Sequence, residues 1–304
     1  MYAAACALTT AFAGQAWASD PITCSFSPTD GLMQVQVEHW GMYNAFGASR
    51  HDQSFRALEW SRNGRRVFDC AGGRPTVRNV DRIEIRQAEP PPEYSTATFL
   101  LDMSQGPFAP GATPEPSGKS EIEVAFHLVN DELNLIAPPG PNRVSFGLAG
   151  EPLAIDLNGD GDLDVSLGRA FLTDFQAGKG ADQVDARTPV TSPRPRHPLL
   201  FISGGDGPDI LIAGRARDQL YGGKGADRVV GSDGGSGNLL AGGGGTDTIA
   251  AGHARNLIMA GRGDDRIDAR NGVRDWISCG PGNDRIVLDR HEEHVDRCEH
   301  LRYR

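Results

Sequence analysis

The chain has few aromatic residues, no excess of positive charge and, after its first 18 residues, no apolar run long enough to cross a membrane. Aromatic residues make up 7% of the 304 residues, and the formal net charge is −10. So acidic a chain is poorly suited to nucleic acid, because it would repel the phosphate backbone. It contains instead 39 glycines, 20 prolines and 40 acidic residues. This composition favours short strands joined by tight turns, with carboxylates that could bind cations.

Residues 1–18 contain no charged side chain, are rich in alanine and end in AWA before Ser19 and Asp20. Such a segment is typical of a secretory signal peptide with a small-residue cleavage site. A buried or anchoring apolar segment is the alternative, because the positively charged region that usually opens an export signal is missing. We expect a secreted, extracellular protein whose mature form has no membrane span.

Cysteine is scarce, with five residues in the chain. Removal of the leader would take Cys6 away and leave Cys24, Cys70, Cys279 and Cys298, an even number in a chain expected to be exported. Four cysteines allow three pairings. Their grouping at the two ends favours Cys24 with Cys70 and Cys279 with Cys298, and free, buried thiols are the alternative.

From residue 204 the sequence repeats with a period close to nine. The clearest units are GGDGPD at 204–209, GGKGAD at 222–227 and GGGGTD at 242–247, each followed by a short apolar segment. Two positions beyond the last polar residue of every unit lies an apolar one: Leu211, Leu220, Val229, Leu240, Ile249, Ile258, Ile267, Ile277 and Ile286. Residues spaced in this way can face one interior only if the chain winds regularly, with a Gly-rich turn and a short strand in each unit.

The units match the pattern G-G-x-G-x-D-x-U-x, in which U is apolar, and they resemble the haemolysin-type (RTX) calcium-binding nonapeptide repeats. The resemblance implies a parallel β-roll in which two units form one coil, so that strands make two parallel sheets and turns stack in two columns. It also implies Ca²⁺ between stacked turns, held by backbone carbonyls and Asp carboxylates. Glycine suits such turns because it adopts left-handed backbone angles, and Ca²⁺ prefers oxygen ligands.

Alternate units lie on the same edge of such a roll, and the two columns of turns differ. One column keeps glycine at the second and fourth turn positions. In the other the glycines are eroded, two of four carboxylates are replaced by amides and three turns contain arginine, which would repel a divalent cation. We therefore expect calcium on one edge only, at four sites between the turns that end at Asp209, Asp227, Asp247, Asp265 and Asp284. Side-chain hydrogen bonds and Arg–Asp contacts are expected to hold the second edge.

The pattern of the better column also occurs earlier, in AGKGAD at 177–182, followed by Val184. We expect the roll to begin here and to span 171–288, with the proline-rich stretch 188–198 as an outward loop or, alternatively, a structureless linker. Asp182 then joins the five carboxylates above as a ligand. The glycines of the candidate site are Gly178, Gly180, Gly205, Gly207, Gly223, Gly225, Gly243, Gly245, Gly261, Gly263, Gly280 and Gly282.

A second candidate metal site lies before the repeats, in the sequence DLNGDGDLD at 156–164. Oxygen-bearing side chains alternate around a turn glycine, as in an EF-type calcium loop. The candidate ligands are Asp156, Asn158, Asp160, Asp162 and Asp164. Leu167 stands where such a loop has its closing Glu, so an acidic hairpin turn between short strands is the alternative.

Residues 19–170 show short apolar or alternating runs at 33–37, 83–85, 98–101, 122–129, 133–136 and 144–146. These runs predict β structure without a long helix. We expect an irregular solenoid continuous with the roll, with disulfide-stapled caps at both ends, the C-terminal cap spanning 289–304; a separate sandwich is the alternative. The expected fold class is all-β, a parallel β-roll or β-solenoid preceded by a β-rich N-terminal region.

The sequence shows no catalytic motif. HEEH at 291–294 has its histidines three apart instead of four, so a solvated cap is favoured over zinc, and GGSGN at 234–238 lacks the final glycine of a nucleophile elbow. His39, His51 and His127 are isolated in sequence. We expect a calcium-dependent structural or surface protein. The alternatives are an extracellular enzyme that acts on polysaccharide through the N-terminal region, and an adhesin; no protein or polysaccharide partner is indicated.

Overall fold

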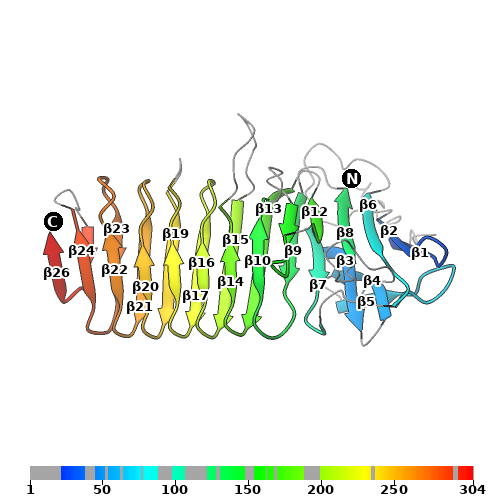
Figure 1. Ribbon diagram of the computed structural model, residues 1–304, viewed down its shortest axis with the longest axis horizontal. Coiled ribbons are helices and arrows are strands. Elements are labelled where there is room, and N and C mark those ends of the chain that lie inside the picture. Colours follow the sequence, from blue (N-terminus) through cyan, green and yellow to red (C-terminus); the bar gives the residue numbers. More distant parts are fainter. Residues whose placement is uncertain are drawn as a thin grey trace, which may run out of the picture.

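The computed structural model describes residues 22–37, 45–51, 54–61, 64–76, 78–87, 98–106, 122–127, 131–147, 154–161, 163–167, 170–187, 199–233, 237–289 and 294–303. These residues form an elongated solenoid of two long β-sheets (Figure 1). None of them lies in a helix that could cross a membrane. The expected all-β solenoid is confirmed.

Two sheets, A and B, face each other along the length of the solenoid. In spatial order, sheet A consists of β1 (Ile22–Ser27), β2 (Leu32–Val37), β6 (Arg82–Gln87), β8 (Glu123–His127), β12 (Val165–Leu167), β11 (Ala154–Asp156), β10 (Arg143–Phe146), β14 (Gln183–Asp185), β16 (Ile210–Ile212), β18 (Arg228–Val230), β20 (Thr248–Ala250), β22 (Arg266–Ala269), β24 (Arg285–Leu288) and β26 (His300–Tyr303). Sheet B consists of β25 (His294–Asp296), β23 (Trp276–Ser278), β21 (Leu257–Arg262), β19 (Leu239–Gly244), β17 (Gln219–Lys224), β15 (Leu199–Asp206), β13 (Ala170–Lys179), β9 (Asp131–Ile136), β7 (Thr98–Asp102), β3 (Ala45–His51), β4 (Ser54–Ser61) and β5 (Gly64–Phe68).

In the repeat region the chain alternates between the two sheets, and each strand pairs in parallel with the strand one coil away. Leu211 of β16 is in register with Val229 of β18, and Leu220 of β17 with Leu240 of β19. Every apolar repeat residue predicted to face the interior is at most 2% exposed. Because side chains alternate between the faces of a strand, a shift of one residue would expose this whole set, and burial therefore fixes the register.

The N-terminal region continues the same two sheets. Strand β10 pairs in parallel with β14, and β9 with β13, so the separate sandwich is excluded. The six runs expected there form β2, β6, β7, β8, β9 and β10. The region is irregular because β1–β2, β3–β4–β5 and β10–β11–β12 are antiparallel. The strands β1, β3, β4 and β5 were not predicted.

The core of the N-terminal region differs in composition from that of the roll. Phe99 contacts Phe126 edge to face with ring centroids 6.2 Å apart, and Phe146 contacts Phe175 in the same way at 6.0 Å. The interior of the roll holds aliphatic side chains instead.

Both predicted disulfides are present. Cys24 of β1 is bonded to Cys70, and Cys279 to Cys298. The first joins β1 to the segment that follows β5, at the N-terminal end of the solenoid, and the second joins the last two coils. The predicted leader, Cys6 and the proline-rich stretch 188–198 lie outside the described residues.

Candidate metal-binding site

The turns that lead from sheet B to sheet A stack along one long edge of the solenoid, the first edge (Figure 1). Each turn has six positions, and the stacked turns occupy 177–182, 204–209, 222–227, 242–247, 260–265 and 279–284. Gly178 is in register with Gly205, and Gly205 with Gly223. The turn that ends at Asp182 therefore stacks directly on the turn that ends at Asp209, and the edge contains five interturn positions where the sequence analysis expected four.

The six Asp residues at the last turn position form a hydrogen-bonded ladder. The backbone N–H of each Asp donates to Oδ1 of the Asp in the next turn. The donor–acceptor pairs are Asp182 with Asp209 at 2.8 Å, Asp209 with Asp227 at 2.8 Å, Asp227 with Asp247 at 2.8 Å, Asp247 with Asp265 at 2.8 Å and Asp265 with Asp284 at 2.9 Å. Each carboxylate is thus fixed in orientation by the coil before it.

The other carboxylate oxygen of these residues is buried without a hydrogen-bond partner. This holds for Oδ2 of Asp182, Asp209, Asp227, Asp247, Asp265 and Asp284, whose residues are at most 2% exposed. Burial, together with the charges of Asp182 and Asp227, raises the pKa of Asp209 to about 6. Burial likewise raises the pKa of Asp227 and Asp265 to about 6. A buried carboxylate with one oxygen left unsatisfied is costly, so a positive charge beside these Oδ2 atoms would stabilise the charged form.

Backbone carbonyls complete the surroundings of these oxygens. A side chain at Gly204 would collide with both Asp209 Oδ2 and Gly222 O, so these two oxygens converge on one point. At the fourth position, a Cβ on Gly245 would overlap Gly225 O, and φ of Gly245 is 138°. Glycine is required at Gly245 because of the positive φ and because there is no space for a Cβ. The carbonyl of Gly225 thus lies directly against the following turn.

This donor set fits Ca²⁺. Each interturn position offers carboxylate oxygens from two turns together with backbone carbonyls, which is the hard-oxygen environment that Ca²⁺ prefers. Within the described ranges, no three His, Cys, Asp or Glu side chains gather to form a metal site by themselves. The carbonyls would therefore supply a large share of the ligands.

The second edge, formed by the turns from sheet A to sheet B, has the same kind of ladder, with amides in place of two of its four carboxylates. Asp218 N–H donates to Asn238 Oδ1 at 3.0 Å, Asn238 N–H to Asn256 Oδ1 at 3.0 Å and Asn256 N–H to Asp275 Oδ1 at 2.7 Å. Side-chain hydrogen bonds thus link these turns, as expected. The ion pairs Arg187–Asp185 and Arg270–Asp268 flank this edge on residues outside the ladder.

Asp218 differs from the expectation for the second edge. Its Oδ2 is buried without a hydrogen-bond partner, as on the first edge, and burial raises its pKa to about 6. Its Oδ1 accepts a hydrogen bond from Leu200 N–H at 3.1 Å. The eroded glycines around Asp218 predicted a residue with a purely structural role. Nothing in the local sequence indicates that its Oδ2 is buried without a hydrogen-bond partner.

Two residues at the ends of the first edge were missed by sequence reasoning. Asn142 ends the turn 137–142, one coil before Asp182, and its N–H donates to Asp182 Oδ1 at 2.7 Å. Glu299 accepts the N–H of Asp284 on Oε2 at 3.0 Å and takes the place of the next Asp. The first could have been found, because APPGPN at 137–142 keeps the fourth glycine and is followed by Val144 at the core position.

The EF-like sequence closes the antiparallel hairpin between β11 and β12, as the hairpin interpretation expected. Asp156 accepts N–H groups from Asn158 at 3.1 Å and from Gly161 at 3.0 Å, and Asp164 accepts that of Leu157. Asp162 lies outside the described residues, and calcium binding by this loop stays a prediction.

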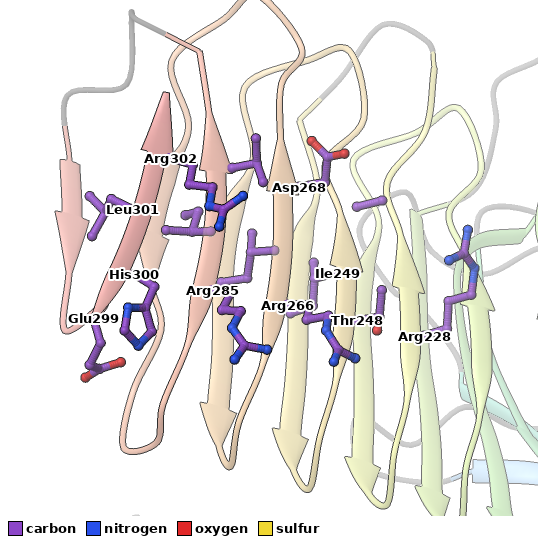
Figure 2. Close-up of a pocket in the computed structure, with 14 residues that line it drawn as sticks. Arg228, Thr248, Ile249, Arg266, Asp268, Arg285, Glu299, His300, Leu301 and Arg302 are labelled. Atoms are coloured by element: carbon purple, nitrogen blue, oxygen red, sulfur yellow. The ribbon is translucent and has the colours of Figure 1, made fainter. Parts of the chain in front are cut away.

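A groove on the outer face of sheet A is cationic, and Glu299 at the end of the ladder also lines it (Figure 2). Arg266 and Arg285 stand side by side on β22 and β24. The groove also contains Thr248 and His300, but β22 and β24 separate their strands, and His300 is hydrogen bonded to Asn283 at 2.7 Å. These residues place no nucleophile beside a base.

The zinc alternative for the HEEH sequence stays a prediction. Its residues 291–293 lie outside the described ranges. His294 is exposed and contacts Trp276, with ring centroids 4.0 Å apart and the rings tilted by 50°.

Comparison with protein families identifies the repeats. A family model described as the RTX calcium-binding nonapeptide repeat matches residues 203–238 and 241–273, in four copies. Searches of curated proteins and of solved structures gave no match. The matched residues cover the middle of the first edge, and these repeats bind Ca²⁺. The chain is therefore a calcium-binding β-roll protein that carries RTX nonapeptide repeats.

Proposed function

We propose that this protein is exported and that its roll folds when Ca²⁺ binds along the first edge, giving a calcium-dependent structural or surface protein. The observation that carries the proposal is the column of six buried Asp Oδ2 atoms without hydrogen-bond partners. The ligands would be the six Asp carboxylates of this column and the carbonyls at the second and fourth turn positions. Ca²⁺ would fill the five positions between successive turns.

The energetic reason is electrostatic. The coils of a parallel sheet lie about 4.8 Å apart, so each buried carboxylate has a like charge one coil away on either side. Bound Ca²⁺ would neutralise this repulsion. At a free Ca²⁺ concentration about ten times the dissociation constant, each site would stabilise the fold by about 1.4 kcal/mol. Several such sites together amount to a large part of a domain's stability.

Chelation of the purified protein tests this function. Hydrogen exchange read by mass spectrometry should show residues 199–288 protected in Ca²⁺ and exposed in excess chelator. A circular dichroism spectrum and an exchange pattern that chelator leaves unchanged would reject calcium-dependent folding.

Calorimetric titration tests the assignment to the first edge. We expect about five Ca²⁺ per chain, one for each interturn position. Asp227→Asn should lower the number bound, whereas the matched change Asp218→Asn on the second edge should leave it unchanged. More than about six bound ions, or a loss in Asp218→Asn alone, would contradict the assignment.

Export is supported by the two disulfides, which persist in oxidising compartments. The leader-like sequence at 1–18 is consistent with this but lies outside the described residues. Sequencing of the N-terminus of the protein recovered from culture medium would test both: cleavage after Ala18 is expected, and retention in the cytoplasm would reject export.

The outer face of sheet B favours a second candidate function, attachment to a partner as in an adhesin. Tyr221, Leu257, Met259 and Trp276 are 40%, 39%, 48% and 50% exposed. Leu257 is in register with Trp276 on the neighbouring strand, so two of these exposed apolar side chains lie side by side. A second copy of the chain is the simplest partner for such a face. Sedimentation velocity should then show self-association that Leu257→Lys with Trp276→Lys removes; a monomeric wild-type protein would reject this partner.

A further inference from the structure

The coil before the first calcium-type turn contains an amide where the later coils have a carboxylate. The turn 137–142 is in register with 177–182, since Val144 pairs with Val184 and Ile136 with Gln176. Asn142 thus occupies the position that Asp182 occupies one coil later. Its backbone N–H takes part in the same ladder.

The side-chain nitrogen of Asn142 is surrounded by oxygen atoms. Nδ2 lies 3.1 Å from Pro138 O, 2.8 Å from Gly140 O, 3.2 Å from Ala177 O and 3.0 Å from Asp182 Oδ1. An amide nitrogen has two hydrogens, so it cannot satisfy four acceptors fully. The oxygens therefore form a shell with more acceptors than an amide requires, as expected for a cavity that suits a cation.

The register of the strands assigns equivalent oxygens to the next coil. By the register of the turns, the oxygens equivalent to those around Asn142 Nδ2 in the next coil are Gly178 O, Gly180 O, Gly204 O and Asp209 Oδ1. The atom equivalent to the nitrogen is then Asp182 Oδ2, which is buried without a partner. The first interturn position therefore contains an amide N–H donor. The later positions contain instead a carboxylate oxygen without a hydrogen-bond partner.

The second edge repeats the arrangement independently. Asn256 Nδ2 lies 3.1 Å from Gly252 O and 2.6 Å from Ala254 O, the second and fourth positions of its own turn, and 3.3 Å from Asp275 Oδ1 of the next turn. Asn271 Nδ2 adds contacts of 2.7 Å to Gly252 O and 2.9 Å to Asp275 Oδ2. Amide nitrogens thus meet the same kinds of oxygen in both columns.

We propose that the side-chain amide of Asn142 replaces Ca²⁺ at its interturn position, because its N–H groups bond the kinds of oxygen that Ca²⁺ would bind at the later positions, and that it so ends the calcium column. Asn256 holds its turn without Ca²⁺ in the same way on the second edge. The inference rests on the proposed binding of Ca²⁺ along the first edge. The choice between Asp and Asn at the last turn position then determines whether a given turn requires Ca²⁺ or is held without it.

Conversion of Asn142 to a carboxylate tests this directly. Equilibrium dialysis should give Asn142→Asp one more Ca²⁺ per chain than the wild-type protein, and a lower unfolding temperature in chelator. Asn142→Leu removes the amide without adding a ligand, so it should gain no Ca²⁺. Asn79→Asp is the matched control, because this Asn also donates to a carbonyl, Arg74 O at 3.1 Å, but lies outside both columns. It too should gain none.

The reverse change keeps the test decisive if Asn142→Asp does not fold. Asp247→Asn retains Oδ1 for the ladder and places an amide nitrogen among the carbonyls. It should bind at least one Ca²⁺ fewer than the wild type, and its unfolding temperature in chelator should rise by a few degrees. A substitution that only damaged the structure would lower the unfolding temperature with and without Ca²⁺.

The outcomes separate this inference from the proposed function. A wild-type protein that binds no Ca²⁺ overturns the proposed function. A wild-type protein that binds Ca²⁺, together with an unchanged stoichiometry in Asn142→Asp or a lower unfolding temperature of Asp247→Asn in chelator, overturns the role of the amide alone.

Discussion

The backbone N–H of Asp209 donates a hydrogen bond of 2.8 Å to Oδ1 of Asp227 in the next coil. The same carboxylate has Oδ2 buried without a partner. One side chain therefore joins two coils through one oxygen and leaves the other for a ligand. The structural and the metal-binding contributions of Asp227 can be separated, because an amide retains the first and loses the second.

Asp227→Ala should be less stable than Asp227→Asn even in chelator. Alanine leaves the buried N–H of Asp209 without an acceptor, which costs about 1–3 kcal/mol, whereas Asn keeps Oδ1. Urea unfolding of both variants in excess chelator measures the difference. Equal midpoints would show that the ladder contributes nothing at this position.

The pH dependence of stability should reverse sign with calcium. Burial raises the pKa of Asp209, Asp227 and Asp265 to about 6, above the ordinary value of 3.8. In chelator, the stability from protonation of these groups is fully present below about pH 4 and is lost as pH rises through about 6. The unfolding temperature should therefore be higher at about pH 5 than at about pH 7.5 in chelator.

In saturating Ca²⁺ the order should be opposite, because protons compete with Ca²⁺ for the carboxylates. Differential scanning calorimetry at both pH values, with and without Ca²⁺, measures the four unfolding temperatures. If the protein in chelator is more stable at about pH 7.5, the buried carboxylates do not control its stability.

Two adjacent glycines of one turn should respond differently to alanine. Gly245 has a φ of 138° and its Cβ would overlap Gly225 O, whereas a Cβ on Gly244 would meet nothing within 4 Å. Gly245→Ala should lower the free energy of unfolding by about 1–3 kcal/mol through backbone strain, and Gly244→Ala should be near neutral. Urea unfolding in Ca²⁺ compares the two, and similar losses would mean that the close stacking of the turns is not required.

Removal of the C-terminal disulfide should loosen the last coils selectively. Cys279 and Cys298 are 19 residues apart, and a loop of this size is worth about 3 kcal/mol. Alanine should fit at Cys279, because Ala260 occupies the same turn position one coil earlier. In the double variant Cys279→Ala, Cys298→Ala, hydrogen exchange should increase over β23–β26. The variant Cys24→Ala, Cys70→Ala should instead affect β1 and β2, and a uniform increase in either protein would contradict local stapling.

Much of the repeat region could be predicted because its information is local. The interval between Asp209 and Asp227 and the apolar residue two positions later are visible in one window of sequence, and they determine the winding, the core and the side of the turn that carries carboxylates. A unit that buries the same residue in every coil needs no distant contact to fix its register. The N-terminal hairpins β3–β4–β5 carry no such period and were missed.

The sequence by itself determined that the chain winds into a roll and which Asp residues line one edge, because both follow from a repeat read along the chain. Only the tertiary structure decided that Asn142 stacks on Asp182 although 40 residues separate them, and that Glu299 closes the other end of the ladder. Hydrogen bonds between strands set the register of neighbouring coils. The segment that connects two coils can vary greatly in length, because a longer loop adds little entropic cost. Spacing along the chain therefore could not show where the column of turns begins and ends.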